Sequence, residues 1–322
     1  MRRTREVTRL AAERATAAGD APEYLTSKQA AAYLHLNEKK LYELAASGEV
    51  PATKATGKWL FPKRLLDEWL LESAHGGAMT DRLVVGGSDD PLLAAAIASL
   101  AADLAGEALV AYSPTGTRLG LELLSRRRTN VAAIHWGPLE SSRTVHAQLV
   151  AAYRGSRDWA IVRMANREQG VILRPGFPEA GSLSALATRR TRWAMRQTGA
   201  GSQHFLESAL REVGLDADRL DVTATALSER HAAALVARGE ADCAPGAASA
   251  AAEFGLAFLP LGWEAFDLVV PRAVFFRSLF HRLLDTLRGE RLRPLAAALA
   301  GYDLSDLGRV VAGPEGTLPG TA

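Results

Sequence analysis

The sequence predicts an α/β protein in two parts: a small block of three helices and a hairpin, then a larger region in which strands and helices alternate. Two observations predict this fold class. Residues 23–73 show helical apolar patterns that are broken by capping residues and a short turn. From Asp81 onward, short β-rich runs alternate with alanine- and leucine-rich stretches of helical length. The chain has 322 residues, which suits two or three domains.

The composition excludes several classes of protein. The formal net charge is +2, so a broad basic surface is not expected. The single cysteine, Cys243, allows no internal disulfide framework. No apolar run reaches the ~18 residues of a membrane span, and the basic N-terminus lacks the apolar segment of a signal peptide. We therefore expect a cytoplasmic protein.

The expected domain boundaries follow from shifts in composition. Residues 1–22 are polar and rich in alanine and arginine, and we interpret them as a flexible N-terminal arm. Residues 23–73 form the first domain. Residues 74–80 contain two glycines and show no periodicity, which is typical of a linker. The second domain spans 81–311, and the Gly/Pro-rich tail 312–322 is expected to be loose.

The first domain contains signals for three helices and a hairpin. Thr26 or Ser27 can cap a first helix, and Asn37 can cap a second helix that ends at Gly48. A hairpin is predicted within VPATKATGKWLF, and Pro62 opens a third helix. The positions expected to be buried are Ala30, Ala31 and Leu34 in the first helix, Leu41, Leu44 and Ala45 in the second, and Leu65, Leu66, Trp69 and Leu70 in the third.

This order of elements is a DNA-reading geometry, in which the second helix enters the major groove and the hairpin lies on phosphates. The stretch LTSKQAAAYLHLNEKKLYELAASGEVPATKATGKWLFPKRLLDEWL resembles the excisionase/MerR-type winged helix-turn-helix. The resemblance implies binding to double-stranded DNA, and a homodimer is expected to read two half-sites. A protein-interaction module is the alternative, because the block holds seven basic and seven acidic residues. The candidate DNA-binding residues are Lys28, Asn37, Lys39, Lys40, Tyr42, Lys54 and Lys58.

In the second domain, small and hydroxyl-bearing residues stand at four expected helix starts, within GGSDDP, YSPTGTRLG, RQTGAGS and TATALSER. A helix N-terminus leaves backbone N–H groups free and carries partial positive charge. Several such starts that converge on a cleft make an oxyanion site without any lysine or arginine. The candidate ligand-binding residues are Ser88, Ser113, Thr115, Gly199, Gly201, Ser202 and Ala226.

The same region resembles the type II periplasmic-binding-protein-like domain of cytoplasmic regulators, which is related to molybdate-binding proteins. LVVGGSDDPLL, REQGVILRPGFP, RQTGAGSQHFLE and LAGYDLSDLG carry the resemblance. It implies two α/β lobes, 81–165 with the segment from about 264, and 166–263, which close on molybdate or tungstate. Asp89 stands where a histidine is common. Ser202 and Gln203 stand where threonine and arginine are frequent, which removes a positive charge from the implied site.

Other polar residues have simpler interpretations. Asp89 and Asp90 precede Pro91 and are interpreted as a helix N-cap rather than as metal ligands. His135 is interpreted as a structural histidine, and Cys243 as a small packing residue. No metal site is expected from the spacing of the remaining candidates, which are His146, His204, His231 and His281.

The sequence therefore predicts a DNA-binding transcriptional regulator whose C-terminal clam-shell senses a small oxyanion and which has no catalytic residues or cofactor. Closure of the clam-shell would change the spacing of two DNA-binding domains. Three alternatives stay open: a clam-shell that binds nothing, a regulator that senses a small organic ligand, and an accessory protein of molybdenum cofactor biosynthesis. The last is considered because related domains occur fused to proteins of that pathway. For an organic ligand, the side chains available to line the cleft are Trp136, Trp193, Trp263 and Phe266.

Overall fold

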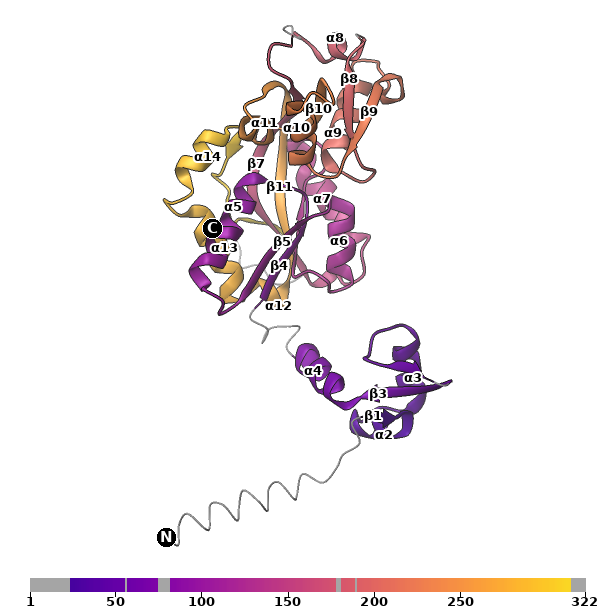
Figure 1. Ribbon diagram of the computed structural model, residues 1–322. Coiled ribbons are helices and arrows are strands. Elements are labelled where there is room, and N and C mark those ends of the chain that lie inside the picture. Colours follow the sequence, from indigo (N-terminus) through magenta and orange to yellow (C-terminus); the bar gives the residue numbers. More distant parts are fainter. Residues whose placement is uncertain (1–23, 56, 75–81, 178–180, 189, 314–322) are drawn as a thin grey trace. The chain divides into compact units, whose positions relative to one another are not determined.

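The computed structural model describes residues 24–55, 57–74, 82–177, 181–188 and 190–313. The chain divides into two compact units, Met1–Thr80 and Asp81–Ala322, which are coloured along the sequence in Figure 1. The expected arm 1–22, the linker from residue 75 and the tail from residue 314 lie outside the described residues. Within the described part, no helix is long and apolar enough to span a bilayer.

The N-terminal unit packs helices against a three-stranded antiparallel sheet with the order β1-β3-β2. The hairpin between the last two strands is present, and Ala55 pairs with Lys58 next to its turn. The elements are β1 (Tyr24–Thr26), α2 (Ser27–Tyr33), α3 (Glu38–Ala46), β2 (Thr53–Ala55), β3 (Lys58–Pro62) and α4 (Lys63–Ala74).

Side chains cap the first two helices, as the sequence predicts. Thr26 forms a capping box on α2: its hydroxyl accepts from the Gln29 amide at 3.4 Å, while the Gln29 side chain accepts from the Thr26 amide at 2.9 Å. The Asn37 side chain accepts from the Lys40 amide at 2.7 Å and caps α3. These bonds fix the turn between the two helices, since they satisfy amides that a helix start leaves without partners.

The core of the N-terminal unit lies between the helices and the sheet. Leu41, Phe61 and Leu66 are fully buried there. The prediction for the third helix is wrong at two positions, because Leu65 and Leu70 are 43% and 39% exposed. A helix repeats every 3.6 residues, so the face that buries Leu66 turns Leu65 outward. Leu70 is one turn further along α4 and is not part of the buried cluster.

The C-terminal unit is built on a ten-stranded sheet with the order β5-β4-β6-β11-β7-β10-β8-β9, onto which β12 and β13 pair at β7. The strands are β4 (Arg82–Gly87), β5 (Leu109–Pro114), β6 (Val131–Ile134), β7 (Trp159–Leu173), β8 (Arg192–Arg196), β9 (Asp221–Ala226), β10 (Cys243–Ala247), β11 (Ala257–Pro271), β12 (Tyr302–Asp303) and β13 (Val310–Ala312).

Two long strands, β7 and β11, pair antiparallel from Trp159↔Pro271 to Leu173↔Ala257 and belong to both lobes. Strands β4, β5 and β6 extend the sheet beside one end of this pair, and β8, β9 and β10 beside the other (Figure 1). Register shifts in β11 occur between Pro260 and Gly262 and between Phe266 and Asp267. The two lobes are therefore connected through continuous strands that are irregular near the boundary between the lobes.

Helices cover both faces of each lobe. In the first lobe, α5 and α13 bury one apolar cluster, while α6 and α7 bury another on the opposite face. In the second lobe, α8 and α9 pack on one face and α10 and α11 on the other. The helices are α5 (Pro91–Leu104), α6 (Thr117–Ser125), α7 (Ser142–Ala151), α8 (Leu183–Thr188), α9 (Gly201–Glu212), α10 (Glu229–Ala237), α11 (Ala248–Glu253), α12 (Arg272–Phe275), α13 (Ser278–Arg288) and α14 (Arg293–Leu299), with short 3-10 turns at Leu139–Ser141, Ser156–Asp158 and Ala217–Arg219.

The sequence predicts separate strands at 159–164 and 170–173, but the structure has the single strand β7. The polar residues between the two apolar runs suggested a break. They remain in the strand because Asn166, Arg167 and Gln169 find hydrogen-bond partners where the lobes meet.

The capping box yields a first prediction. Replacing Thr26 with alanine removes the hydroxyl acceptor at the start of α2, which costs about 1 kcal/mol. We expect hydrogen exchange of the α2 amides in the full chain to accelerate roughly fivefold. Thr26→Ser keeps the acceptor and is the control. Equal exchange in Thr26→Ala and the parent chain would contradict the capping role.

Candidate ligand site between the two lobes

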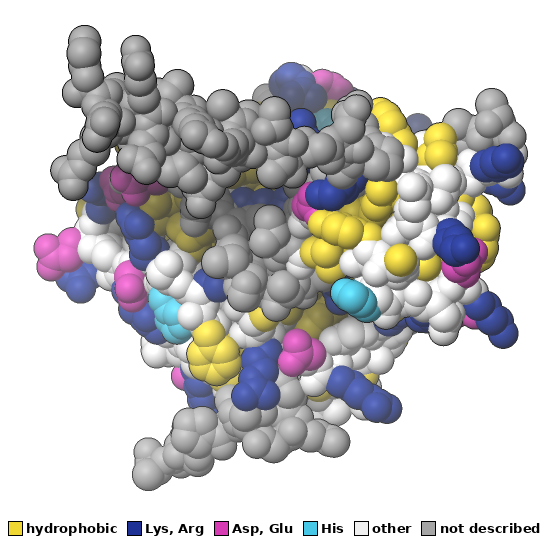
Figure 2. All heavy atoms as spheres, turned by 90° about the horizontal axis from the view of Figure 1, so that it is seen from below, with side chains coloured by type: hydrophobic (Ala, Val, Ile, Leu, Met, Phe, Trp, Pro, Cys, Tyr) yellow, Lys and Arg dark blue, Asp and Glu magenta, His cyan; other side chains and the backbone are white. Residues whose placement is uncertain are grey.

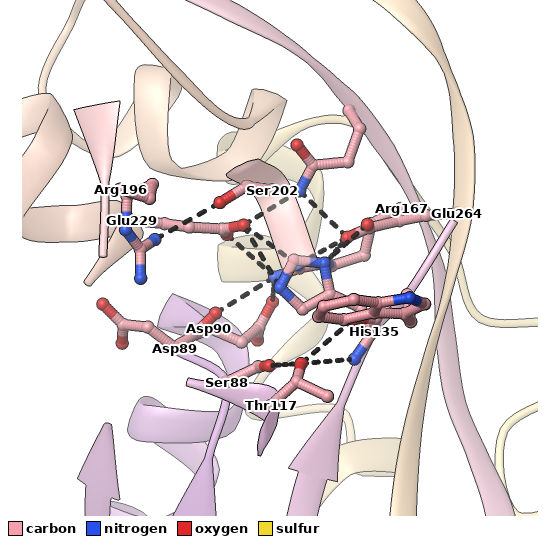
Figure 3. A network of polar contacts seen from close by, with 12 residues as sticks. Ser88, Asp89, Asp90, Thr117, His135, Arg167, Arg196, Ser202, Glu229 and Glu264 are labelled. Atoms are coloured by element: carbon pink, nitrogen blue, oxygen red, sulfur yellow. Dashed lines mark hydrogen bonds and ion pairs between the residues drawn. The ribbon is translucent and has the colours of Figure 1, made fainter. Parts of the chain in front are cut away.

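A buried arginine occupies the boundary between the lobes. Arg167 lies in the middle of β7 with no exposed surface. Its guanidinium contacts carboxylates from three other segments, at 2.6 Å from Glu264 on β11, 3.0 Å from Asp90 before α5 and 3.3 Å from Glu229 on α10. Figure 3 shows these side chains pointing at one another. One cation therefore joins both lobes and both long strands.

Both oxygens of the Glu264 carboxylate have partners besides Arg167. Oε1 accepts from Gln169 at 3.0 Å, and His135 Nδ1 lies 2.6 Å from Oε2. Burial disfavours ionisation of Glu264, but the charges of His135 and Arg167 and the hydrogen bonds from His135 and Gln169 outweigh it and lower its pKa to about 2. Glu264 is thus ionised at neutral pH despite complete burial.

A second buried arginine differs in its partners. Arg196 ends β8 and is 6% exposed. Its guanidinium donates to the carbonyls of Ala226 and Leu227 at 3.2 and 3.3 Å and to the Ser202 hydroxyl at 3.4 Å. In the described parts of the chain, no carboxylate lies within 4.0 Å of it. Burial lowers the pKa of Arg196, while the charges of Glu229 and Asp89 oppose this.

The first lobe contributes two hydroxyl groups, which Figure 3 shows beneath the charged cluster of Arg167. The hydroxyls of Ser88 and Thr117 lie 2.8 Å apart, and Thr117 also donates to the His135 carbonyl at 3.0 Å. Gly201, the first residue of α9 in the second lobe, packs against the same carbonyl. A Cβ at Gly201 would lie 2.2 Å from that oxygen, so this close approach of the lobes requires glycine.

The structure gathers some of the candidate ligand residues and separates others. Ser88, Gly201, Ser202 and Ala226 are buried near the two arginines. Ser113 is exposed at the end of β5. Two others are engaged in backbone contacts: the Thr115 hydroxyl accepts from the Gly87 amide at 3.2 Å, and the Gly199 carbonyl accepts from the Arg118 amide at 3.5 Å. The expectation of a site without formal positive charge is not met, since Arg167 and Arg196 lie in it.

Sequence reasoning missed most of the charged residues of the site. Arg196 and Glu229 lie in two of the expected helix-start segments, and Arg167 and Glu264 lie where the chain is expected to cross between the lobes, but none of the four is predicted as a site residue. An arginine and a glutamine two residues apart within an apolar strand are the signal that was available, because such groups need buried partners. The predicted N-cap is confirmed: the Asp90 side chain accepts from the Leu93 amide at 2.8 Å.

An aromatic contact joins the first lobe to α9 of the second lobe. The rings of Trp136 and His204 stack with centroids 4.5 Å apart, and the Arg118 guanidinium lies 4.9 Å from the Trp136 ring. The Trp136 amide donates to His146 Nε2 at 3.0 Å, and His146 Nδ1 lies 2.7 Å from Asp267. The buried histidine therefore positions the backbone of Trp136.

Of the other candidates for an aromatic lining, two lie elsewhere and one lies against Arg167. Trp193 is buried in the core of the second lobe, and Trp263 is 39% exposed. The Phe266 ring lies 4.2 Å from the Arg167 guanidinium and is covered by it. Cys243 is buried, and burial raises the pKa of its thiol. In the residues that the structure describes, no group of three His, Cys, Asp or Glu side chains is placed to hold a metal ion.

The candidate DNA-binding residues all lie at the surface of the N-terminal unit. Lys40 pairs with Glu43 at 3.5 Å, and the Lys54 ammonium lies 5.8 Å from the Trp59 ring. The Asn37 side chain is occupied by its capping bond. Among the coloured side chains in Figure 2, which belong to both units, basic and acidic side chains are interspersed.

The chain belongs to a family of periplasmic-binding-protein (PBP) superfamily domains, whose model matches residues 98–288. A helix-turn-helix domain model matches residues 24–74. The protein is thus a PBP-like α/β domain preceded by a helix-turn-helix domain. Such domains imply DNA binding by the first part and binding of a small ligand by the second.

Three known proteins are similar to this chain or to part of it. A substrate-binding protein of the phosphate ABC transporter class from Clostridium perfringens, with bound phosphate, has a TM-score of 0.50 at 11% identity and covers 70% of this chain and 100% of its own. A tungstate ABC transporter structure from Geobacter sulfurreducens has a TM-score of 0.47 at 14% identity, with 66% and 95% covered. An uncharacterised protein from Clostridium pasteurianum, encoded in the 5′ region of a ferredoxin gene, is 30% identical over 109 residues, which are 33% of this chain and 96% of that protein. The structural similarity concerns the fold alone.

The charge cluster yields a second prediction. Arg167→Met leaves three buried carboxylates without their shared cation, and we expect the free energy of unfolding of the C-terminal unit to fall by about 3–5 kcal/mol. Arg238→Met removes an exposed arginine that pairs with Glu240, and is the matched control with an expected loss below about 1 kcal/mol. Denaturant unfolding of both variants measures the difference. A loss in Arg167→Met as small as in the control would contradict the bridging role.

Proposed function

We propose that this chain is a one-component transcriptional regulator whose helix-turn-helix domain binds double-stranded DNA and whose two-lobed domain senses a small oxyanion. Molybdate and tungstate are the first candidates. The observation that carries the sensing part is the environment of Arg196, a buried guanidinium with hydrogen bonds to neutral groups but no carboxylate within 4.0 Å in the described residues. A buried cation of this kind is stabilised by an anionic partner.

Two helix starts flank Arg196, and the start of α9 adds donors for the same anion. Ser202, which accepts from Arg196, lies in the first turn of α9, a helix of 12 residues without a side-chain N-cap. The carbonyls of Ala226 and Leu227 immediately precede α10. Backbone N–H groups at helix starts favour negative charge. The guanidinium, the hydroxyl and the amides of the α9 start would therefore act on one oxyanion.

Access to this site requires movement of the lobes. The groups around Arg167 are fully buried and engaged with one another. A ligand that binds between the lobes must exchange some of these contacts for its own, so it favours one lobe arrangement over another. In a homodimer, that change would alter the spacing of two DNA-binding domains and hence the affinity for an operator with two half-sites.

The oxyanion proposal is tested by ligand-induced stabilisation. We expect molybdate, tungstate or another small oxyanion to raise the melting temperature of the full chain at constant ionic strength, with sulfate, phosphate and small organic acids in the same panel. Arg196→Met should weaken binding roughly tenfold or more, because a charge-assisted hydrogen bond contributes about 1.5–3 kcal/mol. Arg211→Met, at an exposed position of α9, is the control. The oxyanion proposal is excluded if no oxyanion stabilises the chain, or if Arg196→Met binds like the control.

The DNA-binding proposal is tested on the exposed face of α3. Fluorescence anisotropy with a fragment from upstream of the gene for this chain should show weaker binding by Lys39→Ala and Lys40→Ala. Each variant should also lower the slope of log affinity against log salt by about one, as expected for a lost phosphate contact. Lys63→Ala removes an ammonium held at 3.0 Å by Asp67 and is the control. Unchanged affinity in both α3 variants would refute this assignment.

A second candidate is a regulator that senses a small organic anion. The stacked pair of Trp136 and His204, with Arg118 beside Trp136, supports it, since a planar ligand could replace one ring of this stack. The same stabilisation panel separates the candidates. Trp136→Leu should weaken binding of an organic acid and leave the affinity for an inorganic oxyanion within about a factor of two.

A further inference from the structure

Asp89 reaches from the first lobe to the second at the proposed anion site. It is 3% exposed, and its Oδ2 accepts from the Arg230 amide at 3.2 Å, in the first turn of α10. Its other oxygen, Oδ1, is buried and has no hydrogen-bond partner among the described residues. Figure 3 shows the carboxylate apart from the carboxylates that surround Arg167. A buried oxygen without a partner needs either a ligand or a proton.

The charges around the site leave no surplus of positive charge for an anion. Four carboxylates are buried there, on Asp89, Asp90, Glu229 and Glu264, against the guanidiniums of Arg167 and Arg196 and the ring of His135. An added anion places further negative charge in a region of low dielectric, which is unfavourable unless a neighbouring charge is removed. Uptake of a proton by one carboxylate removes such a charge.

Asp89 is the carboxylate most easily neutralised. The other three each contact Arg167 at 3.3 Å or less, so their protonation would break an ion pair. Asp89 makes no ion pair within 4.0 Å in the described residues. Burial raises the pKa of Asp89, while hydrogen bonding from Ser228 and the Arg230 amide opposes this. The titratable and charged groups that face it are Glu229 and Arg230 on α10, Arg196 on β8, Tyr112 on β5, Arg167 on β7 and its own neighbour Asp90.

We propose that binding of an oxyanion between the lobes is coupled to uptake of one proton by Asp89, whose new O–H donates a hydrogen bond to the bound anion. This inference rests on the proposed oxyanion site. The proton comes from solvent and is held on Oδ1, and no other bond forms or breaks. The regulator would then respond to the anion and to pH together.

The sign of the pH dependence follows from this coupling. The complex holds one proton more than the free protein and free anion, so affinity rises as pH falls. Between the pKa of Asp89 in the free protein and its higher pKa in the complex, the dissociation constant increases about tenfold for each pH unit. The dependence disappears where Asp89 is already protonated before the anion binds.

Calorimetry with tungstate as the probe counts the proton. The full chain is titrated at one neutral pH, at which tungstate carries no proton, in buffers with different ionisation enthalpies. The slope of the observed enthalpy against the buffer enthalpy should correspond to about one proton taken up. Asp89→Asn, which keeps an acceptor for the Arg230 amide, should take up none and bind with an affinity independent of pH. Asp103→Asn, at an exposed position of α5, should behave like the parent chain.

The outcomes separate this inference from the function on which it rests. Binding by the parent chain without proton uptake, or uptake that is unchanged in Asp89→Asn, overturns the proton coupling and leaves the oxyanion site standing. Absence of binding by any oxyanion overturns both. If Asp89→Asn does not bind, an infrared difference spectrum of the parent chain decides: a protonated-carboxyl band that appears with tungstate supports the coupling, and its absence overturns it.

Discussion

The arrangement of the lobes depends on the burial of Arg167. A guanidinium without access to water is stable only if carboxylates reach it with good geometry, and here they come from the loop before α5, from α10 and from β11. Each of these segments belongs to a different part of the C-terminal unit. The cluster therefore contributes less to net stability than to the choice of one lobe arrangement. Any arrangement that separates Arg167 from these carboxylates leaves charges buried and unpaired.

The long strands β7 and β11 make this arrangement possible. Their pairing spans both lobes, so residues at their centres lie where the two lobes meet. A polar residue at such a position costs stability unless both lobes supply partners. Arg196 and Asp89 lie in the same region but outside the ion pairs of Arg167, one with positive and one with negative charge. A ligand that satisfies both residues needs oxygen atoms that accept from Arg196. It also needs a group that accepts from Asp89 when Asp89 is protonated, or that donates to Asp89 when Asp89 is ionised.

Local signals in the sequence predicted much of the fold. The caps at Thr26, Asn37 and Asp90 are recognisable because capping requires a short polar side chain at a fixed distance from the helix. The alternation of strands and helices predicted the α/β class, because the periodicity of apolar residues shows which face of each element is buried. The continuity of β7 was not predictable in this way, because its polar centre is satisfied by residues 60 to 137 positions away in the chain.

The candidate site was predictable only in part. Small residues at helix starts led to Ser88, Gly201 and Ser202, which the structure brings near one another. Sequence spacing does not reveal which strand residues face the neighbouring lobe, so the two arginines and their carboxylates were missed. The exposure of Ser113 has the same cause, since the direction of a side chain at a strand end depends on the register of the sheet.

The central claim is that an oxyanion binds between the lobes in contact with Arg196. An anomalous difference map from crystals of the full chain grown with tungstate tests it most directly, because tungsten marks the position of the anion without a choice of variant. The account predicts a single strong peak within hydrogen-bonding reach of the Arg196 guanidinium and the start of α9. A map without a peak between the lobes, or with peaks only at exposed arginines on the surface, would contradict it.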